Sequence, residues 1–301
     1  MLRLTMLSIM LVLTASTALG QQQQRNTKRN YPPTFNDATV EVYKEIGDVK
    51  LNIYIFTPEN HKSSDKRPAI VFFFGGGWNS GSPAQFQHHC RYLASRGMVT
   101  MTADYRVFSR HKTRANKCVA DGKSAVRWIR THAARLGIDP DRIASGGGSA
   151  GGHVAACTGT IKGMDEPGED MSISSKPNAM VLFNPATVLA PVEGMKMKPN
   201  DKKRMATLEV RLGVKSTELS PYHNVTSEVP PTIIFHGTGD TTVPFVTAEL
   251  FTDKMNSEGN LCQLVSFKDR PMDSLTTKAA VTKTTSPQSV PWMNFSQNKA
   301  S

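Results

Sequence analysis

Short apolar segments alternate with segments of helical periodicity along most of this chain, and this alternation limits the possible folds more than any other feature. Apolar runs bounded by glycine or polar residues predict buried strands, at residues 69–74, 99–103, 142–145, 179–183, 232–236 and 262–267. The residues between them predict helices at 85–96, 118–136, 151–158 and 244–256. Such alternation builds a mostly parallel central sheet with helices on both faces, so the predicted fold class is α/β.

Two further segments stand outside this alternation. Residues 39–44 and 49–56 alternate apolar and polar side chains around a Gly-Asp pair, which predicts a β-hairpin. Residues 184–230 form a long insertion rich in Lys and Met. We expect this insertion to be a lid, a pocket wall or a tolerated loop. One domain over residues 31–267 accommodates all of these elements.

The first thirty residues have a character of their own. Arg3 precedes an apolar run at 4–15 that is too short to span a bilayer. Ala-Leu-Gly at 18–20 then offers the small residues that a signal peptidase recognises. Residues 1–20 are therefore predicted to be a signal peptide, with an uncleaved anchor as the alternative, and residues 21–30 a polar leader. We expect a secreted or periplasmic protein without a stable membrane anchor.

The charge of the chain is strongly basic but dispersed. It has 36 Lys and Arg against 25 Asp and Glu, a formal net charge of +11. Nucleic-acid binding favours basic residues gathered on one element or face. The densest group here, at 196–204, has few aromatic neighbours. We expect a solvated basic loop there and no nucleic-acid partner.

The four cysteines do not follow the spacing of a zinc site, so no metal is predicted. In an oxidising compartment, Cys90 and Cys118 could form a disulfide because they lie on or beside successive predicted helices. Cys157 and Cys262 are expected to be buried thiols.

Residues 147–151 read Gly-Gly-Ser-Ala-Gly, the G-x-S-x-G pattern between a predicted strand and a predicted helix. The turn is so tight that flanking glycines are needed to prevent clashes of Cβ atoms. It raises the Ser149 hydroxyl above the sheet, and the backbone N–H of Ala150 then faces any oxyanion formed there. The alternative is an incidental serine in a glycine-rich loop, but the strand–turn–helix context favours a nucleophile.

A second glycine run, at residues 75–77, follows another predicted strand. The N–H groups of Gly76 and Gly77, together with that of Ala150, would form an oxyanion hole. A phosphate-binding loop is the alternative, but it would end in Lys followed by Ser or Thr, and this run continues with Trp78.

Asp240 lies after the predicted strand at 232–236 and before the predicted helix at 244–256. A carboxylate in this place can orient the imidazole of a catalytic base. It could instead cap the helix. The presence of the two glycine motifs favours the catalytic role.

These motifs, in this order and spacing, resemble those of the α/β-hydrolase carboxylesterases, in particular the hormone-sensitive-lipase-like and acetylxylan/feruloyl-esterase-like group. The matching pieces are residues 75–81, 104–106 and 147–153, with Asp240 and the Val-Pro pair at 243–244. The resemblance extends from about residue 31 to residue 267 and implies an α/β-hydrolase fold. It implies a nucleophile, an acid and three oxyanion donors, which are Ser149, Asp240, and Gly76, Gly77 and Ala150.

The resemblance also implies a substrate class. It points to a small-molecule or polysaccharide ester, hydrolysed through an acyl-enzyme without a metal or other cofactor. Phe74 departs from the family pattern, which usually has His before the glycines. That residue braces the loop, so this departure concerns loop geometry.

The histidine of the expected catalytic triad is missing. The resemblance places it about 30 residues beyond the acid, but every histidine precedes Asp240. His153 lies one helical turn after Ser149 and is expected to face the packing side, and His236 is expected to be structural. The full set is His61, His88, His89, His111, His132, His153, His223 and His236.

Residues 268–301 form an aberrant tail that is rich in Thr, Ser and Lys and has no strand or helix period. In another reading frame, codons from Lys268 onward can encode Gly-Gln-Thr-His-Gly-Phe-Phe-Asn-Tyr. This resembles the family's histidine segment, Gly-x-x-His-Gly-Phe, and the codons of Met272 and Asp273 force the glycine after the histidine. The hypothesis is a single-base loss near Lys268, with a genuine divergent tail as the alternative.

Three functions are consistent with these observations. The first is an exported serine carboxylesterase, whose activity is impaired in this 301-residue sequence because its catalytic base is missing. The second is a non-catalytic pseudo-hydrolase that keeps the pocket for binding. The third is a truncated product that folds poorly. Peptidase-type serine hydrolases share the fold and are the alternative substrate class.

Overall fold

The computed structural model describes residues 31–193, 207–271 and 276. The chain divides into two compact units, residues 1–36 and residues 37–301. Residues 31–36, the described part of the first unit, contain no helix or strand. The predicted signal peptide and polar leader lie outside the described residues.

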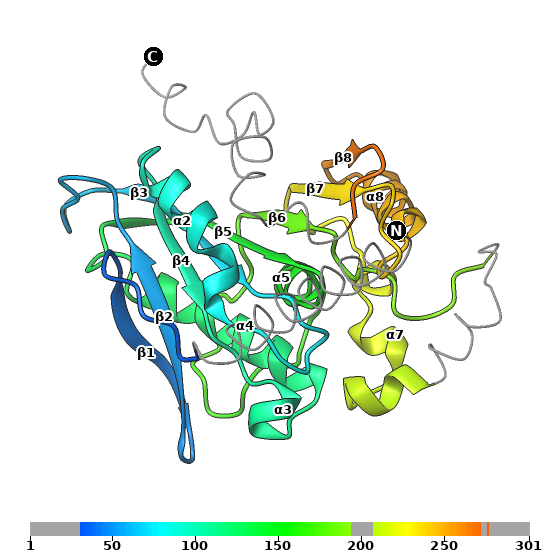
Figure 1. Ribbon diagram of the computed structural model, residues 1–301, viewed down its shortest axis with the longest axis horizontal. Coiled ribbons are helices and arrows are strands. Elements are labelled where there is room, and N and C mark those ends of the chain that lie inside the picture. The colour runs from blue at the N-terminus through cyan, green and yellow to red at the C-terminus, as the bar shows by residue number, and fades with distance from the viewer. Residues whose placement is uncertain (1–30, 194–206, 272–275, 277–301) are drawn as a thin grey trace, which may run out of the picture. The chain divides into compact units, whose positions relative to one another are not determined.

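The second unit is built on one eight-stranded sheet (Figure 1). The strands lie in the order β1-β2-β4-β3-β5-β6-β7-β8. Strand β2 pairs antiparallel with β1 and β4, and the remaining pairs are parallel. The predicted hairpin and mostly parallel sheet are therefore confirmed. The bounds are β1 (Thr39–Ile46), β2 (Val49–Phe56), β3 (Arg67–Phe73), β4 (Val99–Ala103), β5 (Ile138–Gly148), β6 (Ala179–Phe183), β7 (Thr232–Gly237) and β8 (Cys262–Phe267).

The helices also follow the predicted order, with shifted ends. Their bounds are η1 (Pro83–Phe86), α2 (Gln87–Ala94), α3 (Phe108–His111), α4 (Ala115–Thr131), α5 (Ala150–Thr160), α7 (Ser216–Leu219), η2 (Pro221–Asn224) and α8 (Phe245–Ser257). Residues 207–212 are helical as well. Helix α4 ends before Gly137, the predicted stop, because the chain first turns toward β5. Gly137 adopts a φ of +61°, and a Cβ there would lie 2.3 Å from the Lys62 carbonyl oxygen.

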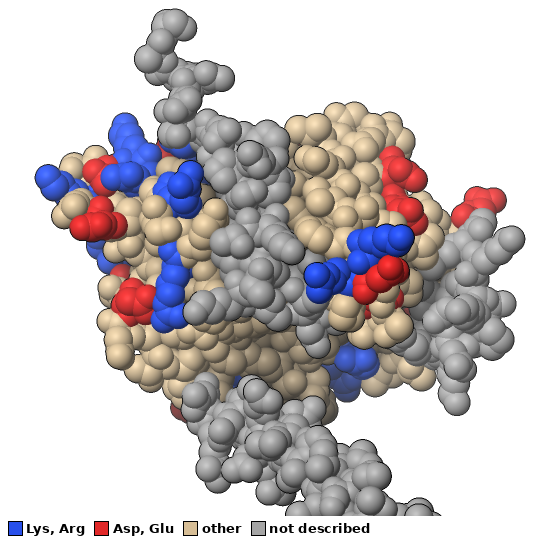
Figure 2. Space-filling view, turned by 45° about the horizontal axis from the view of Figure 1, so that its top comes forward, with Lys and Arg blue, Asp and Glu red and all other residues tan. Residues whose placement is uncertain are grey.

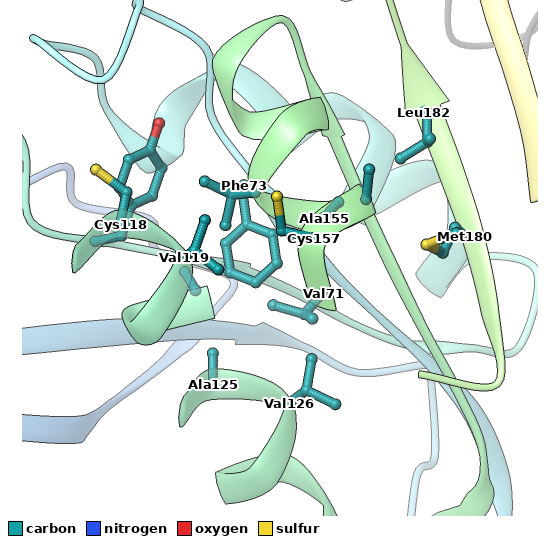
Figure 3. Packing of buried hydrophobic residues seen from close by; sticks show 14 of the residues in the cluster. Val71, Phe73, Cys118, Val119, Ala125, Val126, Ala155, Cys157, Met180 and Leu182 are labelled. Carbon is teal, nitrogen blue, oxygen red and sulfur yellow. The ribbon is translucent and has the colours of Figure 1, made fainter. Parts of the chain in front are cut away.

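Successive side chains of β3 point to opposite faces of the sheet, each covered by different helices. Phe73 packs with Val119 of α4 and Ala155 of α5, in a cluster that also holds Phe251 of α8 (Figure 3). Phe72 faces the other way and stacks on Phe86 of η1, with ring centroids 4.8 Å apart. Both faces of the central strands are therefore buried, which explains their continuous apolar sequences.

The disulfide that Cys90 and Cys118 could have formed is absent, because all four cysteines are free and buried. Cys90 lies on α2, whose His89 contacts Phe72. Cys118 lies on α4, in the cluster on the opposite face. The sheet thus separates the two thiols. Cys157 and Cys262 are buried thiols, as expected.

Basic and acidic side chains are interspersed on the face shown in Figure 2, where the described residues form no continuous basic stripe. The basic group at 196–204 lies outside the described residues. No described helix combines the length and apolar character needed to cross a membrane.

The carboxyl ends of four parallel strands meet at one edge of the sheet. Gly147 of β5 pairs with Phe73 of β3, and Gly148 pairs with Phe183 of β6. Phe183 in turn pairs with Phe235 of β7. The loops that follow β3, β5, β6 and β7 therefore emerge side by side, where open α/β sheets bind their ligands.

Candidate active site

Ser149 occupies a strained turn between β5 and α5. Its φ of +54° and ψ of −120° lie outside the regions that residues with a side chain favour. The turn is held on both sides, since Ser149 N–H donates to the Phe183 carbonyl (2.9 Å) and His153 N–H donates to the Ser149 carbonyl (2.9 Å). Backbone strain of this kind persists where the surroundings over-determine it, often at functional sites.

Two of the three glycines around Ser149, Gly147 and Gly151, are required by close backbone approaches. A Cβ on Gly147 would lie 2.4 Å from the Gly151 carbonyl oxygen. A Cβ on Gly151 would lie 2.1 Å from the carbonyl oxygen of Phe73. The middle glycine, Gly148, has more room, with its nearest atom at 3.2 Å. Within the motif, positions 147 and 151 therefore have no room for a Cβ atom, whereas position 148 can accommodate one.

The glycine loop after β3 runs beside the Ser149 turn. A Cβ on Gly75 would lie 3.3 Å from the Cβ of Ser149. Gly76 and Gly77 both adopt positive φ, +127° and +62°, and a Cβ on Gly76 would lie 2.2 Å from the Ser80 carbonyl oxygen. The loop is anchored at its start, where Gly75 N–H donates to Gln85 Oε1 at 2.5 Å. The glycines that sequence reasoning assigned to an oxyanion hole therefore lie in a tight turn next to Ser149.

Asp240 follows β7 and its carboxylate is buried and fully engaged. Oδ1 accepts the backbone N–H groups of Thr242 (2.8 Å) and Val243 (2.9 Å). Oδ2 accepts the side-chain amide of Asn184 at 2.6 Å. Burial opposes ionisation, but the side chain of His236 and these hydrogen bonds outweigh it and lower the pKa of Asp240 below its ordinary value of 3.8. Asp240 is therefore an oriented anion, a state that suits partnership with an imidazole.

Asn184 is the site residue that sequence reasoning missed. It follows β6 directly with a φ of +44°, and its backbone N–H donates to the Phe235 carbonyl at 2.8 Å. Asn184 thus lies between the Ser149 turn and Asp240, and its side chain holds the carboxylate. In the sequence, the signal for this role was the position of Asn184 directly after the predicted buried strand at 179–183.

His236 is the histidine packed against Asp240. Its Nε2 lies 3.6 Å from Asp240 Oδ2 and 3.0 Å from the Val243 carbonyl oxygen, and both side chains are fully buried. The ring also packs edge-on to Phe245. These contacts tie His236 into the β7–α8 connection, as expected for a structural residue.

Two other buried histidines are also held inside the core. Both ring nitrogens of His153 are engaged, with Trp78 and with the Leu219 carbonyl, and burial lowers its pKa to about 4. His89 lies among aromatic rings, and burial, aided by His88, lowers its pKa to about 3. In the described part of the chain, no histidine nitrogen hydrogen-bonds the Ser149 hydroxyl.

The segment after β8 returns across the same sheet edge. Asp269 N–H donates to Thr238 Oγ1 at 2.9 Å, and the Arg270 carbonyl oxygen packs against Gly237. Thr276 lies beside the nucleophile turn, where Gln85 Nε2 donates to its Oγ1 at 3.4 Å. Most of the predicted aberrant tail, 268–301, lies outside the described residues. Among the described residues, no group of three His, Cys, Asp or Glu side chains could hold a metal ion.

Similar proteins support an esterase-type site. A probable isoprenylcysteine alpha-carbonyl methylesterase of Arabidopsis thaliana is 28% identical over 76% of this chain and 49% of its own length. Esterase LipC of Mycobacterium tuberculosis is 26% identical over 63% of this chain and 48% of its own. The chain therefore spans about half the length of the curated relatives it matches.

Solved structures match over nearly their whole length. Esterase 2 of Thermogutta terrifontis, in a butyrate-bound form, is 46% identical with a TM-score of 0.80, covering 90% of this chain and 99% of that one. Its propionate-bound form gives a TM-score of 0.79 with the same coverage. These likenesses confirm the predicted α/β-hydrolase fold. The BD-FAE family model matches residues 51–255, more than half of the sequence, and this chain therefore belongs to the BD-FAE family.

Proposed function

We propose that this protein is an exported serine carboxylesterase that cleaves acyl esters through Ser149. The observation that carries the proposal is the strained Ser149 turn lying beside the positive-φ glycine loop. A hydroxyl at a helix N-terminus is suited to attack a carbonyl, and backbone N–H groups of an adjacent glycine loop can stabilise the resulting charge. The esterase relatives support the same reaction class.

The proposed reaction has two halves. Ser149 Oγ attacks the ester carbonyl carbon while a base takes its proton, and the carbonyl oxygen gains negative charge. The N–H groups of Gly76, Gly77 and Ala150 donate to this oxyanion. Collapse of the intermediate expels the alcohol, which takes the proton from the base. Water then attacks the acyl-enzyme in the same way and releases the acid.

Asp240 would orient the base, but the 301-residue sequence lacks the histidine that would serve as this base. No histidine follows Asp240 in the 301 residues. In the 301-residue chain, Asp269 lies beside Thr238, and Thr276 lies beside Gln85 near the nucleophile turn. A histidine encoded by a restored frame in this segment would supply the base that Asp240 orients.

The proposed substrates are short acyl esters, on small alcohols or as acetyl or feruloyl groups on polysaccharide. The propionate- and butyrate-bound forms of the Thermogutta esterase support short acyl chains. Export through the predicted signal peptide would bring the enzyme to extracellular carbohydrate. Peptide substrates are the alternative within the same fold.

The test compares the 301-residue chain with a chain in which one base is restored near Lys268, each with and without Ser149→Ala. The genomic DNA across this codon is sequenced first. We expect the restored chain to hydrolyse 4-nitrophenyl acetate, with the Ser149→Ala version inactive. The written chain should be slower by up to about 10⁶-fold, since loss of a triad member can cost that much. Activity that survives Ser149→Ala in the restored chain would reject the proposal.

A non-catalytic binding protein is the second candidate, and the missing histidine favours it. It predicts that genomic DNA contains no additional base and that the written chain binds an acetylated xylo-oligosaccharide without cleaving it. Isothermal titration with that sugar separates the two functions, and Ser149-dependent turnover by the written chain would eliminate this candidate.

A further inference from the structure

Trp78 directly follows the proposed oxyanion donors in a backbone conformation that a large side chain rarely adopts. Its φ is +58°, in the left-handed region. The residue is only 7% exposed, so its indole cannot obtain a hydrogen bond from solvent and needs an internal acceptor. Whatever holds this side chain also holds the turn formed by Gly76 and Gly77.

His153 supplies that acceptor. Trp78 Nε1–H donates to His153 Nδ1 at 3.2 Å, and the two rings pack edge-to-face with centroids 5.1 Å apart. An indole nitrogen can only donate, so Nδ1 must be unprotonated. The proton of the neutral ring is then on Nε2, which donates to the Leu219 carbonyl at 2.8 Å. The two bonds together fix both the tautomer and the direction of the ring.

His153 also lies one turn after Ser149 on α5, and its backbone N–H donates to the Ser149 carbonyl. One side chain therefore joins the nucleophile helix, the loop of the proposed oxyanion hole and the insertion that contains Leu219. Arg211 adds a second contact from the insertion, donating to the Gly77 carbonyl at 2.7 Å and lying over the Trp78 ring.

We propose that His153 is a positioning residue that, through its Trp78 bond, holds the N–H groups of Gly76 and Gly77 in place against Ser149. This rests on the proposed esterase function, because it assigns His153 a part in stabilising the same oxyanion. The role differs from that of a core histidine, which would require only that the cavity be filled and its polar atoms paired.

Two substitutions separate the ring's two hydrogen bonds. His153→Asn keeps an acceptor at the Nδ1 position and loses the donor to Leu219. His153→Gln keeps a donor at the Nε2 position and loses the acceptor for Trp78. Trp78→Phe removes the same bond from the other side. A merely structural histidine predicts similar effects for Asn and Gln, whereas positioning predicts that Asn rescues function and Gln does not.

The first measurement is the rate at which a fluorophosphonate labels Ser149 in the chain whose reading frame is restored near Lys268, followed by intact mass. We expect His153→Gln and Trp78→Phe each to slow the labelling rate at saturating reagent by about tenfold. The reagent concentration that gives half of the maximal rate should change less than about twofold. The double variant should be no slower than either single variant. His153→Asn should remain within about threefold of wild type. Equal losses in Asn and Gln would overturn the proposal.

The second measurement follows the indole N–H of Trp78 by NMR, with its signal identified by its loss in Trp78→Phe. The downfield, exchange-protected signal should persist in His153→Asn and disappear in His153→Gln. If Ser149 is not labelled in the restored chain either, the proposed esterase function fails. The indole signal alone then decides whether His153 holds the loop, and protection in both variants would reject that.

Discussion

Gly151 shows how a single hydrogen atom in place of a side chain determines the nucleophile turn. A Cβ at this position would lie 2.1 Å from the Phe73 carbonyl oxygen and 2.3 Å from that of Phe74, and neither backbone atom can move without disturbing the sheet. We predict that Gly151→Ala destabilises the fold by about 3 kcal/mol and abolishes labelling of Ser149. Thermal unfolding and intact-mass labelling measure these two effects.

Gly148→Ala is the matched control within the same turn. The atoms nearest to its added Cβ lie at 3.2 Å and 3.4 Å on the side chains of Thr276 and Phe86, which can shift slightly. We expect less than about 1 kcal/mol of destabilisation. Equal destabilisation by the two substitutions would show that close backbone approach is not the reason for the Gly151 effect.

The ionised state of Asp240 predicts how its contribution to stability depends on pH. Its pKa is lower in the folded chain than its ordinary value of 3.8, so the folded state favours the anion. The resulting stabilisation is fully present above about pH 4 and is lost as the pH falls through the lowered pKa. The unfolding free energy of wild type should therefore exceed that of Asp240→Asn most at neutral pH, and the difference should shrink toward pH 3.

Urea unfolding of both proteins at several pH values measures this difference. Asn184→Ala provides a second check, because it removes the amide that donates to Asp240 Oδ2. In this variant, the pH-dependent loss of stability should occur at a higher pH than in wild type. A difference that grows on acidification would contradict the assigned direction.

At the scale of elements, a buried ion cluster ties α4 to the edge of the sheet. Asp121 on α4 accepts hydrogen bonds from the backbone and guanidinium of Arg106, and Lys44 of β1 lies 2.8 Å from its carboxylate. Both basic side chains also contact Glu166. Because Asp121, Lys44 and Arg106 are buried, removal of the Asp121 charge leaves Glu166 alone among these four residues to balance two cations.

We predict that Asp121→Asn lowers the unfolding free energy by about 3 kcal/mol, the usual effect of breaking a buried ion pair. Glu41→Gln is the control, since Glu41 pairs with Arg135, which is half exposed, and should lose less than about 1 kcal/mol. Urea unfolding at pH 7 measures both. Similar losses would mean that the cluster does not hold α4 more firmly than a surface pair does.

Elements were predictable from the sequence where local pattern determined them. The continuous apolar run of β4 gave a correct strand because burial on two faces dictates that pattern. The alternation in β1 also gave a correct strand, although its apolar Val40 and Val42 are exposed. The sequence left a Cys90–Cys118 disulfide open because sequence proximity does not reveal which face of the sheet a helix covers. Asn184 and the Trp78–His153 bond were likewise hidden, because each depends on residues brought together only by the folded sheet.

At the scale of the whole molecule, the described helices are unevenly distributed over the sheet. Helices α4, α5 and α8 contribute to the cluster around Phe73, whereas η1 and α2 lie on the opposite face. That second face also carries Phe235, whose ring centroid lies 6.3 Å from that of Phe267, and Val265 and Phe267 of β8 are only partly buried. Aromatic surface of this kind is best covered by an amphipathic helix, and the Thr-, Ser- and Lys-rich sequence after Phe267 has no helical period.

A restored reading frame therefore predicts a gain in stability as well as a catalytic base. Burial of apolar surface contributes about 25 cal/mol per Å², so a final helix over the partly buried Val265 and Phe267 should raise the melting temperature by about 5 °C or more. It should also reduce binding of the dye ANS. Replacing the restored histidine by alanine should remove esterase activity and keep the higher melting temperature, which separates the base from the covering helix. If the written and restored chains melt at the same temperature, the tail as written already completes the fold, and a simple base loss near Lys268 no longer explains it.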